Sequence, residues 1–248
     1  MIQDVAIEVI NLEKKYEKHT VLKDITFTIN KGEIICIAGG SGCGKSTLLR
    51  QIIGLEEPTS GEIYINNEKF FPAPTKTRDK IIKKFGVMFQ LGGLIASMTL
   101  KENIELPLKK YTKLNDKQIE EFIALKLSSV GLDGFQNYFP SEISGGMKKR
   151  ASLARAMALD PEILFFDEPS SGLDPITSAA LDNLIKEINS ALNTTMVIVT
   201  HDLESIFSIA DRVILLDKAV KGILAIGTPD ELKNSKNKII FNFFNRVF

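Results

Sequence analysis

Apolar runs separated by turn residues divide the first ninety positions of the chain into predicted strands. Two partly alternating runs, at 6–10 and 21–29, are rich in β-branched residues and predict strands. Residues 70–77 contain two prolines and are expected to form a loop. Further apolar runs predict strands at 34–38, 62–65 and 85–89.

A helical period replaces the strand pattern between about 91 and 158. The capping pair Asn115 and Gln118 precedes apolar positions spaced three and four apart, and Gly131 ends this predicted helix. A second helix is expected to begin at the N-cap Ser144. We therefore expect an inserted helical subdomain at 91–158, a core at 1–90 and 159–231, and a tail at 232–248.

Strands and a helix alternate again in the last third of the chain. Apolar runs at 163–166, 195–200 and 213–216 predict buried strands, and the last run is expected to close the sheet. Asp174 and Pro175 suit an N-cap and a first helical residue. The apolar face of this helix is expected to comprise Ile176, Ala180, Leu181, Leu184, Ile185 and Ile188.

The segment between the strand at 34–38 and a predicted helix at 46–53 carries the most specific chemistry. It matches G-x-x-x-x-G-K-[ST], a phosphate-binding loop, whereas a glycine-rich turn that binds nothing would not need Lys and Ser in this register. Glycines let backbone N–H groups converge on phosphate oxygens. We expect Lys45 to reach the β- and γ-phosphates and Ser46 to bind Mg²⁺. The loop residues are Gly39, Gly40, Ser41, Gly42, Cys43, Gly44, Lys45, Ser46 and Thr47.

Polar residues follow three of the predicted strands, at the sheet edge where α/β proteins bind ligands. After the run 163–166 come Asp167 and Glu168, which point to different sides. One carboxylate could hold Mg²⁺ and the other could orient the attacking water; a solvated acidic pair is the alternative. His201 could hydrogen-bond a γ-phosphate or that water, and Gln90 beside a glycine pair could reach the site.

Three features have two interpretations each. Tyr16 is either a half-buried tyrosine beneath a hairpin, which the residues alone favour, or a platform for an adenine ring. The Ser-Gly-Gly segment 144–146 is either only a helix cap or a second phosphate-binding helix terminus. The basic residues at 148–150 predict a solvated face. Cys43 is interpreted as an inert small residue rather than a reactive thiol.

Composition narrows the classes of function. The 248 residues include 31 basic and 31 acidic ones, and no basic stripe with interleaved aromatics indicates nucleic acid as a partner. No run approaches the roughly 18 apolar residues of a membrane span, and Met1–Val5 lacks a signal pattern, so we expect a cytosolic location. Cys36 and Cys43 form no disulfide framework.

Together these motifs resemble those of the ATP-binding subunit of an ABC transporter, over essentially the whole chain. The resemblance rests on the phosphate loop, Gln90, Ile143–Met147, Phe165–Glu168, Ser171–Asp174 and His201, in the family's order and spacing. It implies an α/β P-loop fold with a RecA-like parallel-sheet core, an antiparallel β part and a helical subdomain. It also implies a head-to-tail homodimer, with each ATP between the phosphate loop of one copy and Ser144, Gly145 and Gly146 of the other.

The resemblance assigns roles to single residues. Tyr16 matches the aromatic that stacks on adenine, which reverses the first interpretation. Met147 stands where the commonest signature has glutamine, but Ser144 and the backbone donors remain, so hydrolysis is still expected. The other matches are Glu168 as the general base, His201 as the γ-phosphate switch, Gln90 as the link between Mg²⁺, water and the membrane partner, and Asp174 in the cross-dimer loop.

A finer resemblance is to the ATPases of Mla-type, MCE-associated phospholipid transporters. It rests on the segments 89–94, 98–103, 144–147 and 200–207. It implies a polytopic permease, an MCE-domain lipid-binding protein, sometimes a small STAS-like subunit, and a place on the cytoplasmic face of the inner membrane. The alternatives are an importer ATPase for amino acids or similar small solutes and a regulatory ABC ATPase that transports nothing. The aromatic tail at 239–244 is expected either to pack on its own domain or to cross the dimer.

Overall fold

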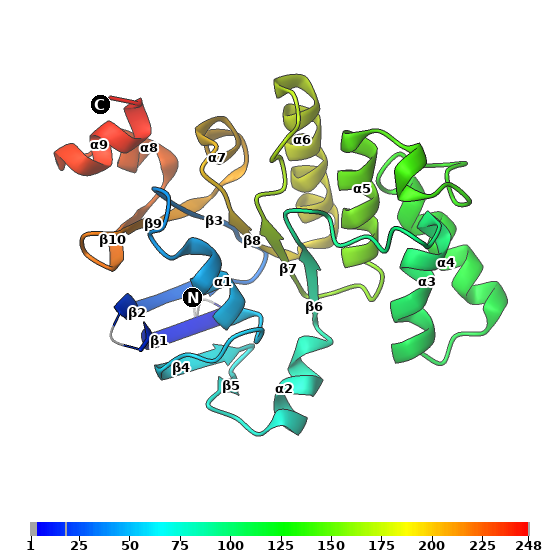
Figure 1. Ribbon diagram of the computed structural model, residues 1–248, viewed down its shortest axis with the longest axis horizontal. Coiled ribbons are helices and arrows are strands. Elements are labelled where there is room, and N and C mark those ends of the chain that lie inside the picture. The colour runs from blue at the N-terminus through cyan, green and yellow to red at the C-terminus, as the bar shows by residue number, and fades with distance from the viewer. Residues whose placement is uncertain (1–3, 18, 248) are drawn as a thin grey trace.

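The computed structural model describes residues 4–17 and 19–247 (Figure 1). Met1–Gln3, Lys18 and Phe248 lie outside the described residues. The predicted lack of a signal pattern at Met1–Val5 therefore falls mostly on residues outside the described ranges.

Two sheets form the centre of the molecule. The first is antiparallel in the order β2-β1-β4-β5. The second has the order β10-β9-β3-β8-β7-β6, in which β10 is antiparallel to β9 and the other pairs are parallel. The bounds are β1 Val5–Tyr16, β2 His19–Asn30, β3 Ile34–Gly39, β4 Ser60–Ile65, β5 Glu68–Phe71, β6 Phe85–Met88, β7 Ile163–Asp167, β8 Thr195–Val199, β9 Arg212–Asp217 and β10 Gly222–Gly227.

Helices cover the parallel sheet and fill the space between the sheets. Figure 1 shows α1 between the two sheets and α3, α4 and α5 gathered beside β6. The bounds are α1 Lys45–Ile52, α2 Thr75–Ile82, α3 Leu100–Tyr111, α4 Asp116–Ser128, η1 Pro140–Glu142, α5 Gly145–Ala156, α6 Pro175–Leu192, α7 Leu203–Ile209, α8 Pro229–Lys233 and α9 Lys238–Asn245. No helix within the described ranges is long and apolar enough to span a membrane.

The core has two layers because successive side chains of a strand point to opposite faces of the sheet. In β3, Ile35 and Ile37 pack with the antiparallel sheet and α1. Cys36 and Ala38 pack with the helices on the other face. A strand covered on both faces needs a continuous apolar run, which explains why 34–38 could be predicted as buried.

Local capping signals are confirmed by the structure. Asn115 and Gln118 form a reciprocal capping box at the start of α4. Ser144 caps α5 by accepting a hydrogen bond from the Met147 N–H at 3.3 Å. Asp174 caps α6 by accepting from the N–H of Ile176 and of Thr177.

Two predictions, one about the length of a loop and one about the last strand of the sheet, are wrong. Residues 70–77 are not one loop, because Phe70 and Phe71 belong to β5 and α2 begins at Thr75. The prolines occupy the short connection between these elements, where they break neither. The run 213–216 does not close the sheet either, since the glycine-bounded strand β10 pairs antiparallel with β9 beyond it.

The predicted apolar face of α6 is wrong at its first turns. Ile176 is 83% exposed and Ala180 is also exposed, whereas Leu181, Ile185 and Ile188 are buried. A helix turns by about 100° per residue, which places position 176 opposite that buried stripe. Ser178 and Asp182 complete the buried face instead.

The carboxyl-terminal helix α9 packs one face on its own domain. Ile240 and Phe244 are buried, and the Phe244 ring lies edge-on to Phe207 with centroids 6.0 Å apart. Ile239 and Phe241 on the other face remain exposed. Packing on its own domain is thus confirmed for the inner face, and contact across a dimer stays a prediction for the outer one.

Candidate nucleotide site

The phosphate loop connects β3 to α1 in a shape that requires glycine. Gly39 has φ 144°, and a Cβ there would lie 2.3 Å from the carbonyl oxygen of Leu216. Gly44, the N-cap of α1, has φ 104°. On the open side, a Cβ at Gly40 or Gly42 would meet nothing within 4 Å. The loop is therefore tightly packed inside, and its backbone is approachable from outside.

Lys45 closes over this loop. Its ammonium group donates to the carbonyl oxygens of Gly39 at 2.8 Å and of Gly40 at 3.1 Å. Cys43 is 2% exposed, and burial raises the pKa of its thiol, which supports an inert small residue over a reactive one. The loop therefore offers one cation, backbone N–H groups and the hydroxyls of Ser46 and Thr47 to a ligand.

Glu168 and His201 meet at the carboxyl ends of β7 and β8. Nδ1 of His201 lies 2.8 Å from Oε1 of Glu168. The Glu168 N–H donates to the Val199 carbonyl oxygen at 2.8 Å, which fixes its backbone to the neighbouring strand. The structure thus brings together two residues that the sequence predicted at this edge.

Asp167 is the last residue of β7 and directly precedes Glu168. Its Oδ1 is buried and has no hydrogen-bond partner among the described residues. Burial and the charge of Glu168 raise the pKa of the Asp167 carboxyl, whereas Arg50 and Lys45 oppose the increase. A buried carboxylate oxygen without a donor suits a cation.

These residues fit Mg²⁺, although no group of three or more His, Cys, Asp or Glu is clustered for a metal in the described parts of the chain. Mg²⁺ is commonly held by one or two protein oxygens together with phosphate oxygens and water. The unpartnered Oδ1 of Asp167 and the hydroxyl of Ser46 are hard oxygen donors of that kind.

Gln90 and the segment 171–174 lie on the same side of the sheet. The Gln90 side-chain amide donates to Oγ of Ser171 at 3.4 Å. Glu168, His201 and the loop 170–172 line one pocket of about 590 Å³, and the tail residues Asn242, Phe243, Arg246 and Val247 line the same pocket. Sequence reasoning did not place the tail here, because its position depends on long-range packing.

Tyr16 ends β1 and is 44% exposed. Its hydroxyl is hydrogen-bonded to Glu56, which raises the pKa of Tyr16, and the Lys14 ammonium lies 5.0 Å from the ring centroid. The Thr47 side chain is close enough to lower the pKa of Tyr16. The tyrosine therefore lies beside the start of α1. An exposed aromatic at this place can take a stacked base.

The segment 144–146 lies apart from the phosphate loop of its own chain. Figure 1 shows α1 and α5 on different sides of β6 and β7. Gly146 is needed for packing, since a Cβ there would lie 2.5 Å from Cγ2 of Thr177 in α6. Within one chain, the amino terminus of α5 and the phosphate loop therefore face different ligand positions.

The expectation of a solvated basic face at 148–150 is wrong for Lys149. This side chain is 8% exposed, and its ammonium donates to the Gln90 carbonyl oxygen at 2.7 Å. Arg150 is half-buried, with Nη1 3.4 Å from the Val130 carbonyl oxygen. Only Lys148 is exposed as expected. The cause is packing of α5 against the segment after β6, which a local charge pattern does not reveal.

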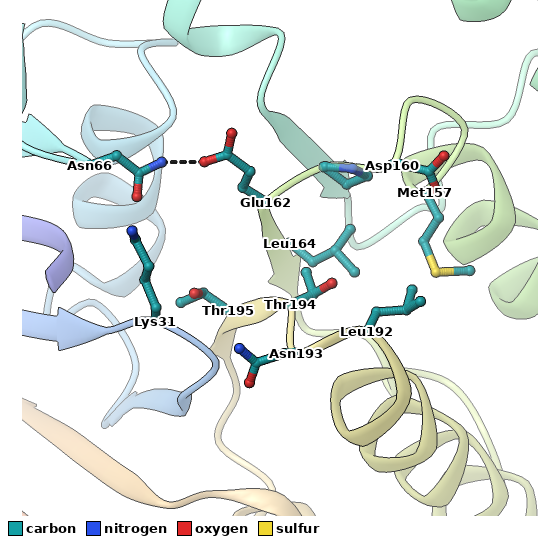
Figure 2. Close-up of a pocket in the computed structure, with 11 residues that line it drawn as sticks. Lys31, Asn66, Met157, Asp160, Glu162, Leu164, Leu192, Asn193, Thr194 and Thr195 are labelled. Atoms are coloured by element: carbon teal, nitrogen blue, oxygen red, sulfur yellow. Dashed lines mark hydrogen bonds between the residues drawn. The ribbon is translucent and has the colours of Figure 1, made fainter. Parts of the chain in front are cut away.

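A further pocket of about 430 Å³ lies at the other end of the parallel sheet. Figure 2 shows Lys31, Leu164 and Thr194 around it and a hydrogen bond between Asn66 and Glu162. It contains no residue of the phosphate loop or of the acidic pair. This pocket therefore lies apart from the candidate residues at the carboxyl ends of the strands.

Comparison with known proteins gives relatives over nearly the whole chain. The profile of the ABC transporter family matches residues 22–171. The "Probable ribonucleotide transport ATP-binding protein mkl" of Mycobacterium tuberculosis is 40% identical over 97% of this chain and 67% of its own length. The "Intermembrane phospholipid transport system ATP-binding protein MlaF" is 40% identical in Escherichia coli, over 92% of this chain and 84% of its own. MlaF of Haemophilus influenzae is 38% identical over 96% and 89%.

Solved structures share the fold. A dimeric post-hydrolysis state of the ATP-binding cassette MJ0796 bound to ADP and Pi has a TM-score of 0.80 and 31% identity, covering 90% of this chain and 98% of that one. CbiO1 of Clostridium perfringens, part of the ABC transporter complex cbiONQ, has a TM-score of 0.86 and 27% identity, covering 97% and 95%.

Proposed function

The chain belongs to the ABC transporter family of ATPases, and from this premise we propose that it is the ATP-hydrolysing subunit of a system that moves phospholipids between membranes. The observation that carries the substrate proposal is 40% identity, over 92% of the chain, with the E. coli protein named for intermembrane phospholipid transport. Two copies act head to tail on the cytoplasmic face of a polytopic permease.

Each of the three parts of the chain has its own role in this proposal. Residues 1–90 and 159–231 form the ATPase core, 91–158 the helical subdomain, and 232–248 the tail. Each ATP lies between the phosphate loop of one copy and the amino terminus of α5 in the other. Ser144 caps only the Met147 N–H, so the first amides of α5, at Gly145 and Gly146, remain for phosphate oxygens.

Nucleotide binding rearranges Lys45 and uses Tyr16. The Lys45 ammonium leaves the carbonyl oxygens of Gly39 and Gly40 and contacts the β- and γ-phosphates. Adenine stacks on the exposed Tyr16 ring. Ser46, Asp167 and Gln90 would hold Mg²⁺, and the ion would neutralise charge on the phosphates.

Hydrolysis depends on Glu168 and His201, which follow β7 and β8. Glu168 accepts the proton of the attacking water, and His201 at 2.8 Å holds that carboxylate and contacts the γ-phosphate. Asp174, which caps α6 beside the loop 171–173, contacts the partner copy. Little covalent chemistry is asked of the protein, since positioning and charge neutralisation supply most of the catalysis.

We expect the permease to bind in a groove beside the Gln90 segment. A groove of about 560 Å³ between α2, β6, α3 and α5 is lined by Phe85, Val87, Pro107, Tyr111 and Arg155. A Cβ at Gly93 would lie 3.4 Å from Nη1 of Arg155, so this groove adjoins the segment that follows Gln90. A helix of the permease in this groove would transmit closure of the ATPase dimer. An MCE-domain lipid-binding protein and a small STAS-like subunit complete the proposed complex.

The test is purification of the tagged chain from its native membrane in a gentle detergent, followed by identification of what comes with it. A permease together with an MCE-domain protein is the expected result. A strain with the tag alone controls for adventitious proteins. A permease with a soluble solute-binding protein would indicate an importer, for ribonucleotides or other small solutes, in place of lipid transport. Absence of any membrane protein would favour a regulatory ATPase.

A further inference from the structure

Lys149 is a buried cation to which the mechanism above gives no role. Its side chain is 8% exposed and donates one hydrogen bond, at 2.7 Å, to the main-chain carbonyl oxygen of Gln90. Burial lowers the pKa of Lys149, and the nearby Glu168 carboxylate opposes that decrease. A buried ammonium group is costly unless it is paired. The Gln90 carbonyl oxygen and the Glu168 carboxylate therefore offset part of the cost of burying this charge.

The segment that follows Gln90 rests on the same face of α5. A Cβ at Gly92 would lie 2.5 Å from Oγ of Ser152, one turn after Lys149. A Cβ at Gly93 would lie 3.4 Å from Nη1 of Arg155, one turn further. Gly92 and Gly93 have φ values of 82° and 67°, which allow this close approach. The segment therefore follows the surface of α5 closely, and Lys149 provides its first polar attachment.

We propose that Lys149 is a positioning residue that ties Gln90 to the signature helix α5. The inference rests on the proposed function, in which Gln90 contacts Mg²⁺ and the amino terminus of α5 contacts the ATP held by the partner copy. Lys149 lies about one turn from Gly145, within one continuous helix. Any displacement of α5 caused by the partner's ATP is thereby passed to the Gln90 main chain. One cation thus links two composite sites of the dimer.

The test compares three variants of the purified full-length chain: Lys149→Met, Lys149→Arg and Lys148→Met. ATP hydrolysis is measured at saturating ATP while free Mg²⁺ is varied. Lys149→Met should raise the Mg²⁺ concentration for half-maximal rate about tenfold, the loss typical of removing a group that orients a metal ligand. Lys149→Arg, which keeps the charge and the donor, should stay within about twofold. Lys148→Met is the matched control, because Lys148 is exposed, and should match the wild type.

A merely structural role predicts a different outcome. It would lower the melting temperature of Lys149→Met and leave its Mg²⁺ requirement unchanged, and that result would overturn the inference. Should Lys149→Met not fold, Lys149→Leu carries the same test, since it also removes both the charge and the N–H donor.

Gln90→Ala separates this inference from the proposed function. If Gln90→Ala leaves the Mg²⁺ requirement unchanged, the proposed role of Gln90 is wrong, and a shift in Lys149→Met would then contradict positioning through Gln90. If Gln90→Ala raises the requirement and Lys149→Met does not, only the inference about Lys149 fails. If both raise it, the double variant should be no worse than Gln90→Ala alone, because residues that act through one another are not additive.

Discussion

Nδ1 of His201 lies 2.8 Å from Oε1 of Glu168, although the two residues are 33 positions apart in the sequence. The cause is the register of two parallel strands, in which Asp167 pairs with Val199. The residues that follow these strands therefore emerge together at the edge of the sheet. Glu168 also has a φ of 49°, an uncommon value for a residue other than glycine. The left-handed turn at Glu168 and the strand pairing together place the carboxylate beside the imidazole.

Glu168→Gln should abolish turnover while keeping ATP bound. Glutamine has the same shape but accepts no proton, so kcat should fall by at least about 100-fold, the usual contribution of a general base. ATP affinity should stay close to that of the wild type, and ATP should trap a closed dimer. Phosphate release and size-exclusion chromatography with ATP check both points. Glu162→Gln, at the opposite end of β7, is the control that should keep full activity. Wild-type turnover in Glu168→Gln would exclude the proposed role.

The sequence predicted the parts of this site that depend on local pattern or on strand ends. The phosphate loop is a contiguous motif between an apolar run and a helix, so its geometry is encoded within about fifteen residues. Asp167, Glu168 and His201 could be placed near one another because each follows a buried strand, and parallel strands end at one edge.

The parts that could not be predicted depend on contacts between distant segments. Lys149 stands in a basic run that is typical of a solvated face, yet the Gln90 segment covers it. The signal that could have revealed it is its helical spacing from Ser152 and Leu153, both buried on α5. Ile176 shows the opposite case, because its apolar side chain predicts burial and yet it is exposed. An apolar residue in the first turn of a helix need not lie on the face that packs against the core.

Tyr16→Ala should weaken ATP binding by about 5- to 150-fold, which corresponds to the roughly 1–3 kcal/mol of stacking one base on an aromatic ring. Tyr16→Phe keeps the ring and removes only the hydroxyl that contacts Glu56, so its affinity should stay within about threefold of the wild type. Titration with a fluorescent ATP analogue measures both. Unchanged affinity in Tyr16→Ala would reject adenine stacking at this ring.

Gly146→Ala should destabilise the fold, although alanine usually favours a helix by about 0.5–1 kcal/mol over glycine. The new Cβ would lie 2.5 Å from Cγ2 of Thr177, whose Oγ1 donates to Asp174 at 2.6 Å and so resists rotation. Overpacking of this kind costs about 1–3 kcal/mol, which exceeds the gain in propensity. Urea unfolding should therefore show a lower midpoint.

Two further variants test the cause of this loss. Thr177→Ser removes Cγ2 and keeps the hydroxyl, so in the Gly146→Ala background it should restore at least half of the lost stability. Gly145→Ala is the matched control, since its Cβ would lie 3.8 Å from Leu173, an ordinary contact. Its stability should equal or exceed that of the wild type. Equal losses at both glycines would contradict a specific clash with Thr177.

Asp182 on α6 makes the stability depend on pH. It is 3% exposed, and its Oδ1 has no hydrogen-bond partner among the described residues. Burial raises the pKa of Asp182 from 3.8 to about 6, partly opposed by the Ser205 hydroxyl. Between these two pH values the folded chain keeps a proton that the unfolded chain has released. This group's contribution to the free energy of unfolding therefore falls as pH rises through that window, and the penalty is complete above about pH 6.

Asp182→Asn should consequently stabilise the protein at pH 8 and have almost no effect near pH 4. The amide has the same shape and no charge to desolvate, and each pKa unit corresponds to about 1.4 kcal/mol, so the expected gain at pH 8 is about 1–3 kcal/mol. Urea unfolding of both proteins at the two pH values measures the difference. An equal gain at both values, or a loss at pH 8, would show that the buried charge of Asp182 is not what limits stability there.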